Sequence, residues 1–161
     1  MAKISFSGLD IYMEQLKRLG ANSEEAAKEA VFNGAGAIAD AVRTGLESIP
    51  TDESWGTETG LKNGLMRVQK DGLLKSLGIS PIDYDGTFLN AKIGFAGYNN
   101  FKTETYPQGQ PNQMIANSAE SGTSFMRKTP FFAAAVRRAK PAAEKIMEET
   151  FEKKINDIMK E

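Results

Sequence analysis

Residues 114–136 read MIANSAESGTSFMRKTPFFAAAV, and this stretch sets the organisation of the chain. Gly122, inside the segment Glu120–Thr123, predicts a tight exposed turn, because glycine adopts positive φ without steric cost. Thr129 and Pro130 predict a helix start, since threonine can cap the helix and a first-turn proline lacks an N–H that would have no partner there. We therefore expect an exposed contact loop at the entrance to a C-terminal helix.

The C-terminal helix is predicted from apolar residues that recur every three or four positions, while charged residues occupy the opposite face. The apolar set is Phe132, Val136, Ala139, Ala143, either Ile146 or Met147, either Thr150 or Phe151, Ile155 and Ile158. Pro141 lies off this stripe and is expected to bend the helix, because it removes one backbone hydrogen bond.

A second long helix is predicted from Asn22 to about Ser48, with either Asn22 or Ser23 as its cap. Its apolar stripe is Ala27, Val31, Ala35, Ile38, Val42, Leu46 and Ile49. Gly34 and Gly36 interrupt this helix, although glycine costs about 1 kcal/mol relative to alanine. They indicate a close approach, either by a helix of the same chain, which is the preferred interpretation, or by a neighbouring subunit.

The other segments are shorter, and their patterns predict a mixture of strands and helices. Strands are expected at 3–7, at 87–98 and, as a return to the sheet, at 114–119; helical patterns span 9–19 and 61–77, with a strand start at 75–79 as an alternative. The predicted fold is α+β: a small antiparallel sheet packed against the second and C-terminal helices, plus shorter helices. All 161 residues are expected to form a single domain.

Two long exposed loops are predicted where Gly, Pro, Asn and Gln accumulate, at Pro50–Gly64 and at Asn99–Asn112. Trp55 stands in the middle of the first loop. A tryptophan in such a loop is either tucked onto the core or held ready for a partner, and the sequence leaves both interpretations open.

Composition excludes several kinds of chemistry. The chain has no cysteine and no histidine, so disulfides, thiolate sites and the commonest general base are absent. No pair of carboxylates is spaced convincingly for catalysis, so no catalytic residue, metal site or cofactor is expected. No apolar run reaches membrane-spanning length, and a soluble cytoplasmic product is the default expectation. A net charge of −1 gives no global attraction to nucleic acid or membrane.

Basic residues gather at the start of the C-terminal helix: Arg127, Lys128, Arg137, Arg138, Lys140 and Lys145. A solvated helix face is the preferred interpretation. A phosphate-binding surface using Arg137, Arg138 and Lys140 is the alternative, and it makes a small nucleic-acid-binding domain the rival function.

The order of these parts resembles a family of tailed-bacteriophage proteins that act in head–tail joining and tail completion. The matching pieces are a strand leading into GLD, an alanine-rich helix closing in SIP, the segment GLLKSLGI and the stretch ESGTSFMRKTPFFAAAV. The family pattern has a Glu two residues before Gly-Thr and a Pro-Phe at the head of the last helix. Glu120, Gly122, Thr123, Pro130 and Phe131 match that pattern.

The resemblance implies a non-enzymatic virion component, made in the host cytoplasm, that forms a ring between the head connector and the tail. Its partners would be further copies of itself, with sixfold symmetry as one arrangement, the connector, and tail-tube or tail-terminator proteins; nucleic acid would be touched only incidentally. The expected contact residues are Trp55, Glu120, Gly122, Thr123, Phe125, Arg127, Pro130 and Phe131.

Overall fold

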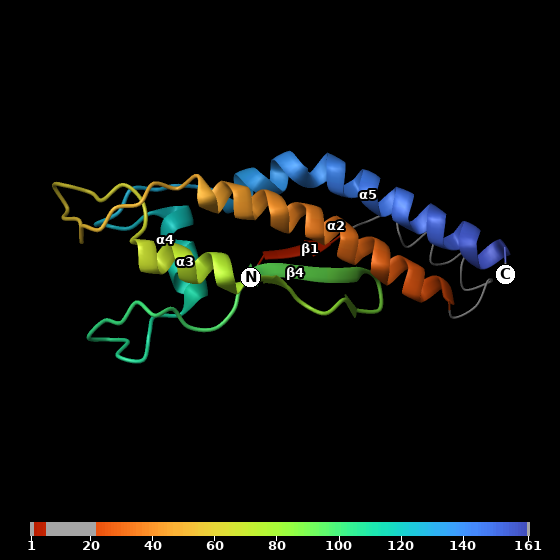
Figure 1. Cartoon of the computed structure of the whole chain (residues 1–161), viewed down its shortest axis with the longest axis horizontal. Coiled ribbons are helices and arrows are strands. Elements are labelled where there is room, and N and C mark those ends of the chain that lie inside the picture. The colour runs from red at the N-terminus through yellow and green to blue at the C-terminus, as the bar shows by residue number, and fades with distance from the viewer. Residues whose placement is uncertain (1, 6–21, 161) are drawn as a thin grey trace. The chain divides into compact units, whose positions relative to one another are not determined.

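The computed structural model describes residues 2–5 and 22–160. Their order is β1 (Ala2–Ser5), α2 (Asn22–Glu47), α3 (Arg67–Ser76), β2 (Leu77–Ile79), β3 (Asp83–Tyr84), β4 (Leu89–Phe95), α4 (Asn112–Ser121) and α5 (Phe132–Lys160). The predicted α+β class is confirmed, with an antiparallel sheet, two long helices packed together and two short helices (Figure 1).

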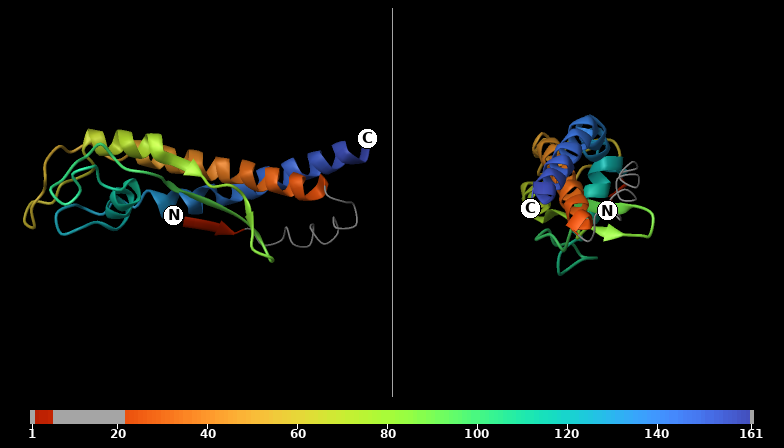
Figure 2. Two further views of the ribbon diagram at one scale, coloured as in Figure 1. Left: turned by 90° about the horizontal axis from the view of Figure 1, so that it is seen from below. Right: turned by 90° about the vertical axis from the view of Figure 1, so that its right-hand side faces the viewer.

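Strand β4 is the centre of the sheet. On one edge it pairs antiparallel with β1, from Ala2 opposite Ile93 to Ser5 opposite Asn90. On the other edge it meets β2 and then β3, whose residue Asp83 also pairs with Asn90 (Figure 2). All of β4 is buried except Lys92, so this strand is covered on both faces. The predicted strand in 87–98 is therefore confirmed as a central strand.

The described residues divide into two compact units. The loop unit consists of residues 40–78 and 94–138, and it contains α3, α4 and both long loops. The helix-pair unit consists of the described residues among 2–39, 79–93 and 139–160. Helices α2 and α5 and strand β4 contribute residues to both units.

In the helix-pair unit, α2 lies alongside α5 (Figure 1 and Figure 2). The stripe predicted for α2 is fully buried along its length, from Ala27 to Ile49. A Cβ added to Gly34 would overlap Cγ of Met147 and would lie 3.2 Å from the carbonyl oxygen of Ala143. The close approach predicted at Gly34 is thus made by the chain's own α5, and core packing within one subunit is confirmed there. At Gly36, by contrast, a Cβ would meet nothing within 4 Å.

The loop unit has its own core, built from the end of α2, from α3 and α4, and from the start of α5. Its fully buried large side chains include Leu46, Leu65, Leu73 and Ile115. The helical pattern predicted over 61–77 is confirmed only from Arg67 to Ser76, and the alternative strand is confirmed from Leu77 to Ile79. The missing side chain of Gly72 leaves room for the amide of Asn99.

The prediction that residues 114–119 return to the sheet is wrong, because they lie in α4. Ile115, Ala116 and Ala119 are buried there at helical spacing, while Met114 is exposed. The side chain of Asn112 donates to the carbonyl of Ala96 at 2.9 Å and so ties the first turn of α4 to the chain that leaves β4. A short apolar segment does not itself distinguish helix from strand, and this anchoring contact comes from the tertiary fold.

The strand predicted at 3–7 is confirmed over residues 3–5, and the helix predicted at 9–19 lies outside the described residues. No helix in the described part of the chain is both long and apolar enough to cross a membrane.

Gly34→Ala and Gly36→Ala form a matched test of helix packing in the helix-pair unit. Both changes should gain about 1 kcal/mol of helix propensity. Only the Gly34→Ala side chain meets Met147, and overpacking of that kind costs about 2 kcal/mol. Urea unfolding should therefore show Gly34→Ala less stable than the wild type by about 1 kcal/mol and Gly36→Ala more stable by a similar amount. Equal effects of the two changes would contradict the close approach of α5.

Candidate partner-contact surface

The glycine turn predicted after Glu120 is confirmed. Helix α4 ends at Ser121, and Gly122 has φ = 75° with its N–H bonded to the carbonyl of Ser118 at 2.8 Å. The chain then reverses, because the backbone N–H of Thr123 donates to the carbonyl of Met126 at 3.0 Å. We call residues 122–127 the bend. Most of the bend is exposed; Met126 is buried.

The carboxylate of Glu120 caps the following helix. Its Oε2 accepts hydrogen bonds from the backbone N–H groups of Phe131 at 3.0 Å and Phe132 at 2.8 Å, and its Oε1 accepts from Ala133 at 3.0 Å. These amides have no partner inside the helix, and the negative charge lies against the positive end of the helix dipole. Glu120 therefore joins α4 to α5 and holds both ends of the bend.

The predicted cap by Thr129 is wrong. Its hydroxyl donates to the carbonyl of Ala119 at 3.0 Å, and its backbone N–H donates to the same oxygen at 2.8 Å. Helix α5 begins at Phe132, so Pro130 precedes the helix and does not occupy its first position. The reason is that Glu120, from outside the segment, satisfies the donors that a local cap would have served.

The residues expected to contact partners fall into two groups. Trp55, Thr123, Phe125, Arg127 and Pro130 are exposed, with Trp55 at 69% and Phe125 at 50%. Phe131 corrects the prediction, since it is 5% exposed and its ring lies 6.1 Å from that of Phe95 in the core. Glu120 and Gly122 are half-buried, and both shape the bend.

The first long loop docks on the bend through backbone hydrogen bonds. The N–H of Lys62 donates to the carbonyl of Phe125 at 2.9 Å, and the N–H of Arg127 donates to the carbonyl of Lys62 at 3.0 Å. At Gly56, where φ is 73°, a side chain would collide with the carbonyl of Phe125. The loop therefore follows the bend closely, and an isolated parallel β-bridge pairs Lys62 with Met126.

Trp55 connects the two long loops. Its ring lies 5.6 Å from the ring of Phe101, centroid to centroid, in a tilted arrangement. Aromatic pairs at this separation are attractive beyond the area they bury. Because Trp55 stays mostly exposed, the structure places it at the surface, stacked against the second loop, and not in the core.

A pocket of about 230 Å³, which we call the aromatic pocket, opens between these segments. Trp55, Phe101 and Phe125 contribute its aromatic lining, and Leu65 and Ile115 add aliphatic surface. Lys62 also lines the pocket and is only 7% exposed. Burial lowers the pKa of Lys62, and attraction to Asp52 and Glu53 opposes that shift.

Asp52 fixes the base of the first loop. Its carboxylate accepts the backbone N–H groups of Ser54 at 2.9 Å and Asn63 at 2.8 Å. Hydrogen bonding by the Ser54 side chain, followed by these amides, lowers the pKa of Asp52 to about 2. This network holds the chain on both sides of Trp55.

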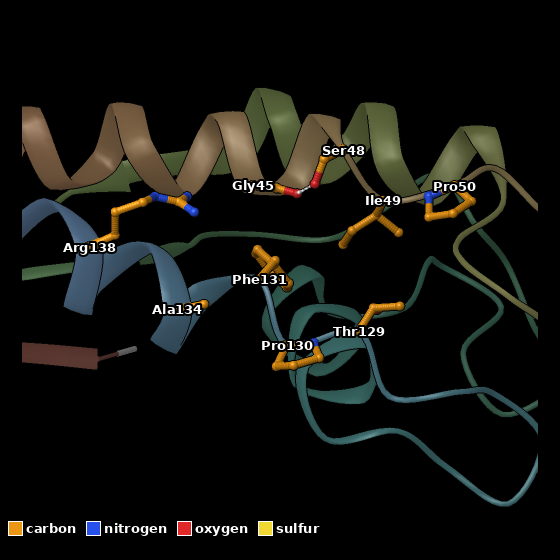
Figure 3. Close-up of a pocket in the computed structure, with 9 residues that line it drawn as sticks. All are labelled: Gly45, Ser48, Ile49, Pro50, Thr129, Pro130, Phe131, Ala134 and Arg138. Atoms are coloured by element: carbon orange, nitrogen blue, oxygen red, sulfur yellow. Dashed lines mark hydrogen bonds between the residues drawn. The ribbon is translucent and has the colours of Figure 1, made fainter.

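A second pocket, of about 260 Å³, lies where α2 ends and α5 begins (Figure 3). Its lining includes Ile49, Pro50 and Pro130, with Arg138 at the α5 side. Gly45 allows the close approach here, because a Cβ on it would lie 3.1 Å from the carbonyl oxygen of Phe131.

The predicted basic residues Arg137, Arg138 and Lys140 are all exposed. Nζ of Lys140 lies 4.0 Å from a carboxylate oxygen of Glu144. Neither Arg137 nor Arg138 forms an ion pair within the described ranges, so both guanidinium groups are open to solvent. Across those same ranges, no group of three or more acidic, histidine or cysteine residues could hold a metal ion.

Glu120→Ala should lower the free energy of unfolding by about 2 kcal/mol, because three amides lose their acceptor and the helix dipole loses its counter-charge. Glu120→Gln keeps a neutral acceptor and should cost about 1 kcal/mol. Ser121→Ala, an exposed neighbour without a side-chain hydrogen bond, is the control and should change stability little. Urea unfolding measures all three; a Glu120→Ala protein as stable as the control would refute the capping role.

The loop network around Asp52 should weaken in acid. Since its pKa is lowered from 3.8 to about 2, the stabilisation is fully present above pH 3.8 and is lost as pH falls through 2. The difference in unfolding free energy between the wild type and Asp52→Asn should be constant above that range and shrink below it. Asp71→Asn, which removes an exposed aspartate that accepts no hydrogen bond, serves as the control. A difference that does not change with pH would contradict the assignment.

Comparison of the chain with protein-family models, with curated proteins and with solved structures gives no match.

Proposed function

We propose that this chain is a non-enzymatic virion-assembly protein of a tailed phage or prophage, and that it joins the head connector to the tail by ring-forming contacts. One observation carries the proposal: the residues that resemble the joining family lie together at the junction of α4 and α5. We call this junction the clasp. Glu120 caps α5, Gly122 makes the turn, and Phe131 anchors the far end in the core. The clasp leaves the bend between them exposed to a partner.

The side chains around the bend suit protein–protein contact. Trp55, Leu61 and Phe125 are large, apolar and exposed, and all belong to the loop unit. Aromatic anchors of this kind carry much of the binding energy at protein interfaces. The rigid clasp supports the same interpretation, because a preorganised loop loses less conformational entropy on docking.

The face of α2 that carries Gly34 contributes less to ring contacts than the sequence suggests. Gly34 is already covered by α5, so lateral contacts between copies fall to the loops and to exposed side chains. The partners proposed are other copies of the chain, the head connector, and tail-tube or tail-terminator proteins.

The alternative is a nucleic-acid-binding domain, and the unpaired guanidinium groups of Arg137 and Arg138 favour it. Binding through phosphate contacts weakens steeply with added salt. Replacing both arginines with glutamine should then abolish binding to duplex DNA. The joining role instead predicts weak or no binding to naked DNA, and the formal net charge of −1 favours it.

Sedimentation velocity across a concentration series tests the joining role directly. The wild type should self-associate as its concentration rises. Phe125→Ala should weaken that association at least about tenfold, because it removes an exposed aromatic anchor of the bend. Phe32→Ala is a matched control: Phe32 has the same exposure, 50%, but lies on α2 in the helix-pair unit. A chain that stays monomeric throughout, or equal effects of the two substitutions, would count against the proposal.

A further inference from the structure

We propose that the aromatic pocket binds a segment of a partner protein in which a carboxylate stands next to a large apolar side chain. The inference deepens the proposed function and rests on it only for the expectation that the partner is a protein. It assigns a chemical specificity to a defined cavity of the loop unit, built by both long loops, the bend and α4.

The size of the pocket indicates a side chain as its occupant. Its volume is about 230 Å³, whereas pockets for drug-sized ligands span roughly 300–1,000 Å³. Three aromatic rings offer a surface for one large apolar group, and the nearly fully buried side chains of Leu65 and Ile115 also line the pocket. Anchoring of one partner side chain in such a pocket is the usual form of an interface hot spot.

The charge of the pocket indicates a carboxylate beside that anchor. Lys62 is 7% exposed, yet its ammonium has no hydrogen bond or ion pair in the part of the chain described. Every fully buried side-chain nitrogen or oxygen in those same ranges does have a hydrogen-bond partner, so the ammonium must keep contact with solvent. An amine at the end of a largely buried side chain, with water as its partner, gains from an incoming anion that pairs with it.

The nearby carboxylates do not fill this role. Asp52 accepts the amides of Ser54 and Asn63, and Oε1 of Glu53 accepts the backbone N–H of Arg67 at 2.8 Å. They attract Lys62 from a distance without pairing with it. A partner carboxylate that reaches hydrogen-bond distance would therefore add an interaction that the free subunit lacks.

A second copy of the chain is a poorer occupant than a different protein. Within residues 2–5 and 22–160, its exposed acidic–aromatic segment is Asp83–Asp85, in which the hydroxyl of Tyr84 donates to the carbonyl of Gly86 at 3.0 Å. That bond holds the ring against its own turn. We therefore assign the pocket to another component of the assembly.

The probe is a displayed library of short random peptides, selected on the full-length protein. Selected peptides should carry Asp or Glu next to an aromatic or long aliphatic residue. The best peptide is then titrated while the emission of Trp55 is followed, because Trp55 lines the pocket and is the single tryptophan of the chain. Replacing the peptide's carboxylate with an amide should weaken binding about tenfold or more.

Lys62→Met should remove that discrimination, so that the acidic and amide peptides bind equally. Lys62→Gln provides a second, polar variant in case Met disturbs the loop. The control is Lys75→Met, which removes the same charge from an exposed position of α3 outside the pocket and should keep the full preference. Circular dichroism of each variant checks that the fold is intact.

Several results would overturn the inference: no saturable peptide binding, selected peptides without acidic residues, or an unchanged carboxylate preference in Lys62→Met. Loss of self-association in both Lys62→Met and Asp83→Asn, with no peptide bound, would assign the pocket to a second copy and overturn the choice of partner. Peptide binding by a protein that never self-associates would contradict the proposed ring and leave the peptide specificity of the pocket standing. Self-association that is unaffected by Lys62→Met, with no peptide bound, would contradict the inference about the pocket and leave the proposed ring standing.

Discussion

The carboxylate of Glu120 makes the contact on which the bend and the loops of the loop unit depend. It comes from the last turn of α4 and accepts the first amides of α5, which are separated from it by the whole bend. Without it, the start of a 29-residue helix would present unpaired donors to a half-buried site. Because both helices are held at the same point, the chain between them can only project as a short, shaped loop.

The bend in turn positions the first long loop through backbone hydrogen bonds. Lys62 exchanges backbone hydrogen bonds with the bend, at Phe125 and Arg127, and Asp52 ties the base of the loop together. Trp55 then reaches Phe101 in the second loop. The same set of contacts thus exposes apolar side chains and buries most of Lys62. In this way, loop segments rich in Gly, Asn and Thr form a defined pocket.

The helix-pair unit is stabilised differently, because apolar side chains at helical spacing are buried between its elements and individual polar contacts matter less. The α2 stripe is buried, as are Ala143, Met147 and Phe151 of α5, and the close approach of Met147 and Ala143 to α2 requires the glycine at position 34. Ion pairs such as Lys154 with Glu29, at 2.9 Å, lie at the surface and add little. In the loop unit, by contrast, polar and aromatic groups are individually positioned.

The sequence by itself determined the features that local rules control. The α2 stripe follows from a 3.6-residue period, the turn at Gly122 from the freedom of glycine, and the two long loops from their composition. Tertiary structure decided what depends on distant partners. Residues 114–119 became a helix because their apolar side chains fit one buried face, and Glu120 displaced Thr129 as the cap of α5. Lys62 is buried because its loop folds onto the bend. No periodic pattern in the sequence predicts such a contact, because side chains that meet across loops have no fixed spacing along the chain.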